Sequence, residues 1–299
     1  MIKVAFLTPL PPQKTGNADY AYDLISGLSK IEDLDITVCA NIDGYINDKV
    51  KVKNVISEDI DYNLYDLIVY QLGNNSEFHS YMYEVLKKYG GIIHLHDIVL
   101  HQVLADALDY KNNYEKYLNT ISKIYGFNVS GYVKELLGLK IEPWKTSIVN
   151  SLPCFEEFVY YSDSCIVHSD FVRSKILEKF PYKNIYKIDQ LYNISPKVVK
   201  RQNSIRFGVF GGVEVNRKVD LVIDAISDII KENENETIEL IIVGAVTKKC
   251  EYLYELPLKN GIKNSVIFYK HVDDDMFLQL LNSIDVLISL RSPTVGETS

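Results

Sequence analysis

The chain has 299 residues, of which 47% are hydrophobic and 24% charged, and its formal net charge is −8. This composition is typical of a soluble globular protein, and the length suits two domains with separate cores. The acidic balance and the lack of a polybasic tract argue against nucleic acid as a partner.

Cysteine usage and hydropathy indicate the compartment. Four cysteines, Cys39, Cys154, Cys165 and Cys250, are scattered without a C-x-x-C spacing. This pattern favours reduced, buried thiols over a disulfide framework or a zinc site. The start, "MIKVAFLTPLPP", is too short for a signal peptide, and no run approaches the roughly 18 apolar residues of a membrane span. We therefore expect a cytoplasmic protein.

Short apolar runs alternate with helical patterns from the start of the chain. The runs "IKVAFLT", "DITVCA", "DLIVYQL", "GIIHLH" and "SCIVHS" predict buried parallel strands, because both of their faces are apolar. Between the first two runs, residues 18–28 predict a helix with one buried face. That face carries Ala18, Ala21, Tyr22, Ile25 and Leu28.

The loop "TPLPPQKTGNADYAYDL" between the first predicted strand and helix is a candidate ligand site. Gly16 lets the backbone approach a ligand, Asn17 is a candidate N-cap, and free N–H groups at the helix start suit an anion. The spacing is not G-x-G-x-x-G, so it is no dinucleotide signature. A plain capped turn is an equally good interpretation.

The run "HLHDIVLH" concentrates titratable side chains at the end of about the fifth strand. It holds His94, His96, Asp97 and His101, and the first two point the same way if the strand continues. An H-x-H pair suggests a metal, but no later acidic or histidine cluster was found to complete a ligand set. We predict no metal, a role for His94 either in the core or in supporting the site from behind, and His96 and Asp97 facing a cleft as catalytic candidates.

Residues 105–161 interrupt the alternation with a helical, aromatic segment. Aromatic faces suit sugars or lipid tails, but we expect most of these rings to pack the inserted helices. A second alternating series follows the polar stretch "NISPKVVKRQNS", with strands "IRFGVFG", "IELIIVG", "SVIFY" and "DVLISL". One predicted helix of this series has an apolar side formed by Val219, Val222, Ile223, Ile226, Ile229 and Ile230.

The two series predict an α/β protein with two Rossmann-like, doubly wound domains facing a cleft. The first covers residues 1–195, with the helical insertion at 105–161, and the second covers residues 204–299. Ligands of such sheets bind beyond the carboxyl ends of the strands.

Two stretches of the second domain could bind an anion at such ends. In "FGVFGGVEVNRKVDLVIDAI", Gly211 and Gly212 follow a strand, and Arg217 and Lys218 fall at a helix start. Cations at a helix start interact unfavourably with the helix dipole unless a bound anion, such as a diphosphate, neutralises them. The alternative is that both are ordinary solvated side chains on the surface. In "RSPTVGETS", Gly296, Glu297, Thr298 and Ser299 predict a helix start that could hold a phosphate.

In order and spacing, these motifs resemble the metal-independent retaining glycosyltransferases of the GT-B architecture, the large family 4. The motifs are the loop after the first strand, "HLHD", "CIVHSDFVRSKI", "GGVEVNRKVDLVIDAI" and "DVLISLRSPTVGETS". The resemblance implies an acceptor-binding first domain and a nucleotide-sugar-binding second domain. It implies transfer of a hexose from a nucleoside diphosphate sugar to a glycan or lipid-linked acceptor, without a cofactor, in polysaccharide biosynthesis.

The resemblance also implies residue roles. Gly16 would lie near the donor phosphate and acceptor, and His96 would face the transferred sugar. Lys218 would neutralise the departing diphosphate, and Glu297 would bind hydroxyls of the donor sugar.

This chain departs from the family pattern at two places. Many members have Arg where Gly212 stands, so Arg217 is expected to substitute, or leaving-group stabilisation is weaker. The second Glu of the E-x7-E motif would fall past Ser299. We therefore expect a fragment whose second domain is truncated, with an exposed strand at 285–290 that favours dimerisation and with poor donor binding.

Two other functions remain open. One is a non-catalytic subunit that binds glycan, nucleotide or a partner and derives from a transferase. The other, more distant, is a metal-dependent hydrolase that uses "HLHD". For the transferase, contact with the inner face of the cell membrane is an alternative to a purely cytoplasmic location.

Overall fold

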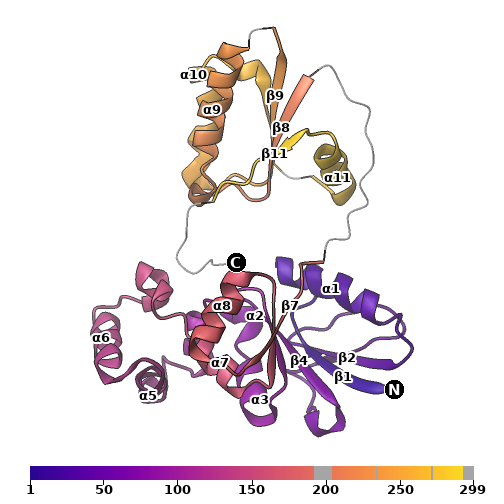
Figure 1. Ribbon diagram of the computed structural model, residues 1–299, viewed down its shortest axis with the longest axis vertical. Coiled ribbons are helices and arrows are strands. Elements are labelled where there is room, and N and C mark those ends of the chain that lie inside the picture. Colours follow the sequence, from indigo (N-terminus) through magenta and orange to yellow (C-terminus); the bar gives the residue numbers. More distant parts are fainter. Residues whose placement is uncertain (192–203, 234, 271, 292–299) are drawn as a thin grey trace. The chain divides into compact units, whose positions relative to one another are not determined.

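A computed structural model of the chain describes residues 1–191, 204–233, 235–270 and 272–291. Contacts divide the chain into two compact units, a first one over Met1–Tyr192 and a second one over Asn193–Pro293 (Figure 1). Among the described helices, none combines the length and the apolar character that a membrane span requires.

The first unit is built on a parallel sheet of seven strands in the order β3-β2-β1-β4-β5-β6-β7. The order reverses between β1 and β4, which makes the gap between their carboxyl ends the topological switch point. The sequence predicted five of these strands and missed the edge strands β3 and β7, whose sequences "KVKN" and "NIYK" are short and polar. The strands are β1 (Ile2–Leu7), β2 (Leu34–Ala40), β3 (Lys51–Asn54), β4 (Leu67–Leu72), β5 (Ile92–Leu95), β6 (Ser164–Val167) and β7 (Asn184–Lys187).

Helices pack against this sheet (Figure 1). They are α1 (Gly16–Leu28), α2 (Ser76–His79), α3 (Met82–Tyr89), α4 (His101–Ala107), α5 (Tyr114–Tyr125), α6 (Phe127–Gly138), α7 (Phe155–Tyr161) and α8 (Asp170–Lys179). Three short 3-10 turns lie at Tyr62–Leu64, Pro143–Lys145 and Ser147–Asn150.

The start of α1 differs from the prediction. The N-cap is Thr15, whose hydroxyl accepts a hydrogen bond from the Asn17 N–H at 3.4 Å, so the assignment of Asn17 as the cap was wrong. Thr15 has the extended backbone that a cap needs, whereas Asn17 already lies inside the helix. On the predicted apolar face Ala18 and Ala21 are buried, but Tyr22 is 39% exposed.

The aromatic segment between β5 and β6 packs mainly into the core, as predicted. Tyr117, Trp144 and Phe158 are buried, and the Tyr110 ring meets the Trp144 ring edge-on at 4.8 Å. Phe127 is the clearest exception, since it is 83% exposed. Figure 1 shows α5 and α6 side by side at the outer edge of the first unit.

The second unit has a parallel sheet of four strands in the order β10-β9-β8-β11. The strands are β8 (Ser204–Phe210), β9 (Thr237–Val243), β10 (Val266–Tyr269) and β11 (Val286–Leu287), and the helices are α9 (Val219–Glu232), α10 (Leu256–Lys259) and α11 (Asp274–Asn282). Three 3-10 turns lie at Val215–Arg217, Lys248–Tyr254 and Lys263–Ser265. The sheet thus repeats the order of β3-β2-β1-β4 in the first unit.

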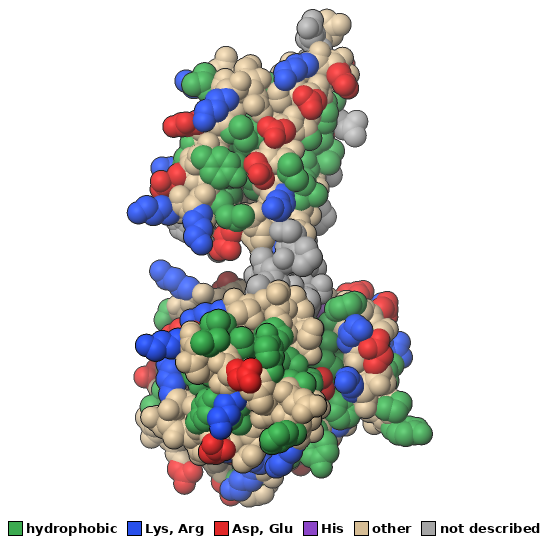
Figure 2. Space-filling view, turned by 90° about the vertical axis from the view of Figure 1, so that its left-hand side faces the viewer, with side chains coloured by type: hydrophobic (Ala, Val, Ile, Leu, Met, Phe, Trp, Pro, Cys, Tyr) green, Lys and Arg blue, Asp and Glu red, His purple; other side chains and the backbone are tan. Residues whose placement is uncertain are grey.

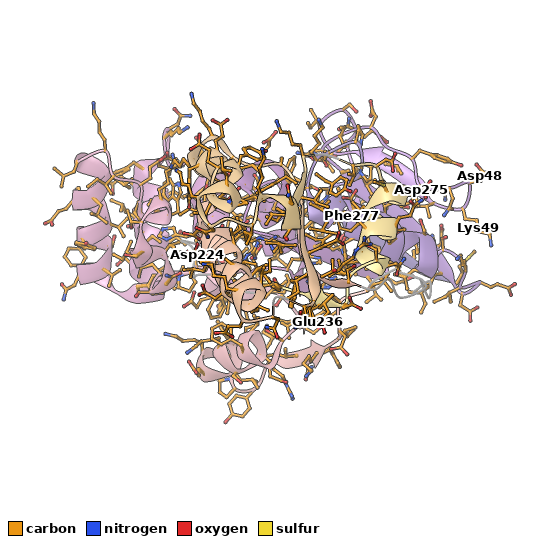
Figure 3. All side chains as sticks on the ribbon, turned by 90° about the horizontal axis from the view of Figure 1, so that it is seen from above. Asp48, Lys49, Asp224, Glu236, Asp275 and Phe277 are labelled. Carbon is orange, nitrogen blue, oxygen red and sulfur yellow. The ribbon has the colours of Figure 1, made fainter. Side chains whose placement is uncertain are left out.

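Helices cover both faces of this second sheet. Figure 3 shows α9, marked by Asp224, and α11, marked by Phe277, on opposite sides of the strands. The α9 stripe buries Val222 and Ile226 as predicted, and the Phe277 ring meets Phe210 edge-on at 5.2 Å. The switch point of this unit lies between the ends of β8 and β11.

The distribution of surface charge and the burial of the cysteines match what the composition predicted. On the face shown in Figure 2, acidic and basic side chains are interspersed on both units, so positive charge does not gather there into one stripe. All four cysteines are free and buried, which confirms the prediction of buried, unpaired thiols.

His101 makes the stability of the first unit depend on pH. It is buried, a 2.6 Å hydrogen bond joins its Nε2 to the Tyr117 hydroxyl, and burial lowers its pKa from 6.5 to about 4. Because the folded pKa lies below the unfolded one, the stabilisation is complete above pH 6.5 and is lost as the pH falls toward 4. Between pH 7 and pH 5, His101 alone should reduce the free energy of unfolding by roughly 2 kcal/mol.

The measurement uses Trp144, the only tryptophan, whose ring centroid lies 5.7 Å from that of His101. Urea unfolding followed by Trp144 fluorescence should show a smaller loss between pH 7 and pH 5 in His101→Gln than in the wild type. Equal losses in both proteins would show that His101 is not the group responsible.

Candidate functional site

A cluster of glycines forms the carboxyl edge of the second sheet. Gly211 follows β8 and Gly244 follows β9, and both have positive φ angles, +105° and +147°. A Cβ placed on Gly244 would lie 2.1 Å from the Gly211 carbonyl oxygen, so no other residue fits there without a backbone shift. The Gly211 N–H donates to the Val243 carbonyl and the Gly244 N–H to the Tyr269 carbonyl, both at 2.8 Å.

Gly212 leaves this edge open. It is exposed, and a Cβ on it would meet no heavy atom within 4 Å. Bare backbone at the end of a parallel strand, next to the start of α9, can approach a phosphate closely.

Arg217 and Lys218 differ from their predicted positions. Both precede α9, so the expectation of two cations inside its first turn was wrong: Arg217 ends a 3-10 turn and Lys218 is the N-cap. Lys218 has left-handed backbone, φ 49° and ψ 40°, which accounts for the break between the two elements. Arg217 lies against the glycine turn, because a Cβ on Gly211 would be 2.8 Å from its Nη2.

These cations have no anionic protein partner among the described residues. The ion pairs among the described residues involve neither Arg217 nor Lys218. Two uncompensated charges beside a helix N-terminus and an open glycine backbone are suited to binding an anion. The other candidates of this domain, Gly296, Glu297, Thr298 and Ser299, lie outside the described residues.

In the first unit the switch point lies at the loops after β1 and β4. Gly16 is the first residue of α1; it is exposed, and a Cβ on it would meet nothing within 4 Å. Asn17, one residue on, reaches the loop after β4: its Nδ2 lies 3.2 Å from the His79 Nε2. A Cβ on Gly73 would lie 2.3 Å from that Asn17 Nδ2, so the loops are closely packed there.

A cluster of three histidines lies at the same edge of this sheet. His94 is in β5, His96 directly follows it, and His168 directly follows β6. The ring centroids of His94 and His96 are 4.7 Å apart, as expected for two side chains on one side of the strand, and His168 lies 4.8 Å from His94. The Tyr20 ring of α1 meets all three edge-on, at 4.8 to 5.8 Å.

Burial keeps two of these imidazoles neutral. Burial and, to a smaller extent, the neighbouring imidazoles lower the pKa of His94 to about 3 and that of His96 to about 2. His94 is in the core, as predicted, and His96 is partly buried. Asp97, beside His96, is partly buried as well.

Three residues of these sites were not predicted from the sequence. No later histidine was expected to complete a set with His94 and His96, but His168 does so because β6 pairs with β5. Tyr20 and Gly244 were also missed. His168 in "SCIVHS" and Gly244 in "IELIIVG" could have been found, because each lies at the carboxyl end of a predicted parallel strand.

Comparison with known proteins gives a likeness in structure only. No protein-family model and no curated protein matches the chain. Among solved structures, sucrose-phosphate synthase from Thermosynechococcus elongatus matches with a TM-score of 0.57 and 10% identity over 96% of this chain and 75% of that one. WaaG, a glycosyltransferase involved in lipopolysaccharide biosynthesis, matches at 0.53 with 12% identity over 97% and 75%. Anabaena Alr3699/HepE in complex with UDP and glucose matches at 0.50 with 13% identity over 99% and 76%.

These likenesses extend over both units and define the class of fold. The chain has the GT-B fold, with two parallel Rossmann-like sheets, which confirms the predicted fold class. It spans about three quarters of the length of the structures that it matches. Membership of family 4 stays a prediction.

The glycine contact at the second sheet leads to a stability prediction. Gly244→Ala should destabilise the second unit by about 2 kcal/mol or more, because the new Cβ meets the Gly211 carbonyl and the backbone is strained. Gly212→Ala is the matched control, and it should change the free energy of unfolding by less than about 0.5 kcal/mol. Amide hydrogen exchange in β8 and β9 measures both; equal protection in the two variants would contradict the described contact.

Proposed function

We propose that the protein is a glycosyltransferase that moves a sugar from a nucleoside diphosphate sugar to a hydroxyl of a glycan or lipid-linked acceptor, with retention at the anomeric carbon. The observation that carries this proposal is the open glycine turn of Gly211 and Gly212 with Arg217 and Lys218, at the switch point of a GT-B second unit. Solved structures of this fold include one with UDP and glucose bound, which makes UDP the first nucleotide to test.

Charge neutralisation at the leaving group is the chemistry that this turn would supply. In the reaction, the bond from the anomeric carbon to the diphosphate oxygen breaks and a bond to the acceptor oxygen forms. The proton of the acceptor hydroxyl goes to the departing phosphate. Arg217, Lys218 and the start of α9 would stabilise the charge that develops on the diphosphate, so this step would need no metal at the phosphates.

Arg217 is the stronger candidate of the two cations. Its guanidinium lies beside Gly211, where a phosphate could approach the bare backbone, and its planar fork can donate two hydrogen bonds to one phosphate. Lys218 would act as a second, point-like charge at the N-cap of α9. We further propose that Glu297, with Gly296, Thr298 and Ser299, holds the donor sugar and phosphate, as the family resemblance implies.

The first unit would bind the acceptor and face the transferred sugar. Gly16 offers exposed backbone after β1, and His96 and Asp97 follow β5 at the same edge of the sheet. A neutral imidazole can donate or accept a hydrogen bond to a sugar hydroxyl, and the low pKa of His96 keeps it neutral at physiological pH.

A non-catalytic binding subunit is the second candidate function. Gly212 favours this function, because it has no side chain at the position where many members of the family that the sequence resembles have an Arg. The second unit also exposes β11: Val286 is 42% and Leu287 56% exposed, as predicted for this strand. Among the described strands β11 is the outermost one of its sheet, and an outermost strand suits pairing with another copy or with a partner.

The diphosphate site is tested by removing each cation. Arg217→Ala should weaken UDP binding by about 1.5–3 kcal/mol, the range for a lost charge-assisted hydrogen bond, and Lys218→Gly should weaken it as well. Glycine is chosen at position 218 because it suits the left-handed backbone. Lys231→Ala, at the other end of α9, is the control and should leave the affinity unchanged. Calorimetric titration that finds wild-type affinity in both test variants would exclude this site.

The role of His96 is tested by activity. His96→Ala should reduce the rate of sugar transfer while leaving the far-UV circular dichroism spectrum and UDP affinity close to those of the wild type. The physical reason is that His96 belongs to the first unit, and the diphosphate cations belong to the second. Unchanged turnover would remove His96 from the catalytic candidates.

A further inference from the structure

The three histidines form a group whose arrangement goes beyond the proposed transfer reaction. One ring nitrogen each from His94, His96 and His168 lies within 4.8 Å of the others, and the Nε2 atoms of His94 and His168 are 2.9 Å apart. Two nitrogens bound to one tetrahedral zinc ion, each at about 2.0–2.1 Å, lie roughly 3.3 Å from each other. Small side-chain adjustments would therefore place all three nitrogens around one ion.

Two of the rings have a polar contact on the side away from this centre. The His168 Nδ1 lies 2.8 Å from the Ile188 carbonyl oxygen, which can only accept, so Nδ1 carries a proton and the neutral ring offers its lone pair at Nε2. The His94 Nδ1 lies 3.4 Å from the amide nitrogen of Gln71, which is fully buried. The Ile188 carbonyl is an outer partner of the kind typical of metal-binding histidines, whereas the Gln71 amide must turn before its oxygen can accept from the His94 ring.

In the absence of an ion, this arrangement leaves two polar atoms unsatisfied. With the His168 ring in this tautomer, the His94 Nε2 donates the proton in the 2.9 Å contact. The His96 Nε2 and the Gln71 Oε1 are then buried without a hydrogen-bond partner among the described residues. An unsatisfied buried polar atom costs about 1–3 kcal/mol, so a ligand for the His96 nitrogen would be stabilising.

We propose that His94, His96 and His168 bind one first-row transition metal ion, with Zn²⁺ as the leading candidate, and leave a fourth position open to water or an oxygen ligand. Neutral imidazoles are the form that binds metal, and burial keeps His94 and His96 neutral. A set of three imidazoles suits Zn²⁺, Co²⁺, Ni²⁺ or Cu²⁺ and discriminates against Mg²⁺ and Ca²⁺, which prefer oxygen.

Metal binding requires one change of tautomer. The His94 proton moves from Nε2 to Nδ1, and the Gln71 amide turns so that its Oε1 accepts from Nδ1–H. The edge of the Tyr20 ring limits the space on the α1 side of the three rings. The proposal uses none of the glycine-turn residues of the second unit, and it shares only His96 with the proposed sugar-facing site.

The test uses the full chain without an affinity tag, stripped of metal and titrated with Co²⁺ and then Zn²⁺ against a chromophoric chelator. We expect one equivalent per chain, a dissociation constant of about 1 μM or tighter, and the visible absorption of Co²⁺ with nitrogen ligands in a low-symmetry site. Zn²⁺ should also raise the melting temperature, since it binds the folded state.

Two variants and one control assign the ligands. His96→Asn and His168→Asn should each weaken Zn²⁺ binding about 100-fold or more, and His101→Gln, a buried histidine outside the cluster, should not. Circular dichroism checks that the variants are folded. If His168→Asn does not fold, the Zn²⁺ affinity of His96→Asn and the cobalt spectrum of the wild type decide whether the histidines bind the metal. No saturable uptake by the wild-type chain, or uptake that persists in His96→Asn, would overturn the proposal.

Discussion

The close approach of two backbones at the carboxyl edge of the second sheet is the constraint on which the candidate donor site depends. Gly244 lies so near the Gly211 carbonyl that a Cβ would be 2.1 Å away. This contact lets the loops after β8 and β9 run side by side, and hydrogen bonds from Val213 to Ala245 and from Thr247 to Val213 continue it. The chain can then turn into α9 with Gly212 exposed and Arg217 against the turn.

The two units present opposite electrostatics at their strand ends. The second unit places Arg217 and Lys218, which have no acidic partner among the described residues, beside open backbone, an arrangement that favours a charged phosphate. The first unit instead buries imidazoles until they are neutral, with pKa values of about 3 for His94 and about 2 for His96. Such groups can bind hydroxyls or a soft cation without carrying charge themselves. This difference is the physical basis of the proposed division between donor and acceptor roles, and all three proposed metal ligands belong to the first unit.

Local patterns in the sequence were enough to predict most elements. Continuous apolar runs mark the central strands, and the 3.6-residue stripe of Val222, Ile223 and Ile226 marks α9, because both depend on neighbours along the chain. The edge strands β3 and β7 were not predicted because they bury little surface and their sequences are polar. The break between the 3-10 turn and α9 at Lys218 was not predicted because only its left-handed backbone reveals it.

The site residues that the sequence did not predict depend on contacts between distant segments. His168 joins His94 only through the pairing of β5 with β6, across a helical insertion that separates them in sequence. Gly244 matters only because Gly211 lies on the neighbouring strand end. No spacing rule within one motif contains that information, whereas strand order does.

The central claim is that a nucleoside diphosphate binds at the glycine turn of the second unit. Backbone amide chemical shifts measured by NMR during a UDP titration test it most directly. The account predicts that the largest saturable shifts fall on residues 211–218 and 244–247, with the amides of Gly211, Gly212 and Gly244 among them. Saturable shifts confined to the first unit, or no shifts at millimolar UDP, would contradict it.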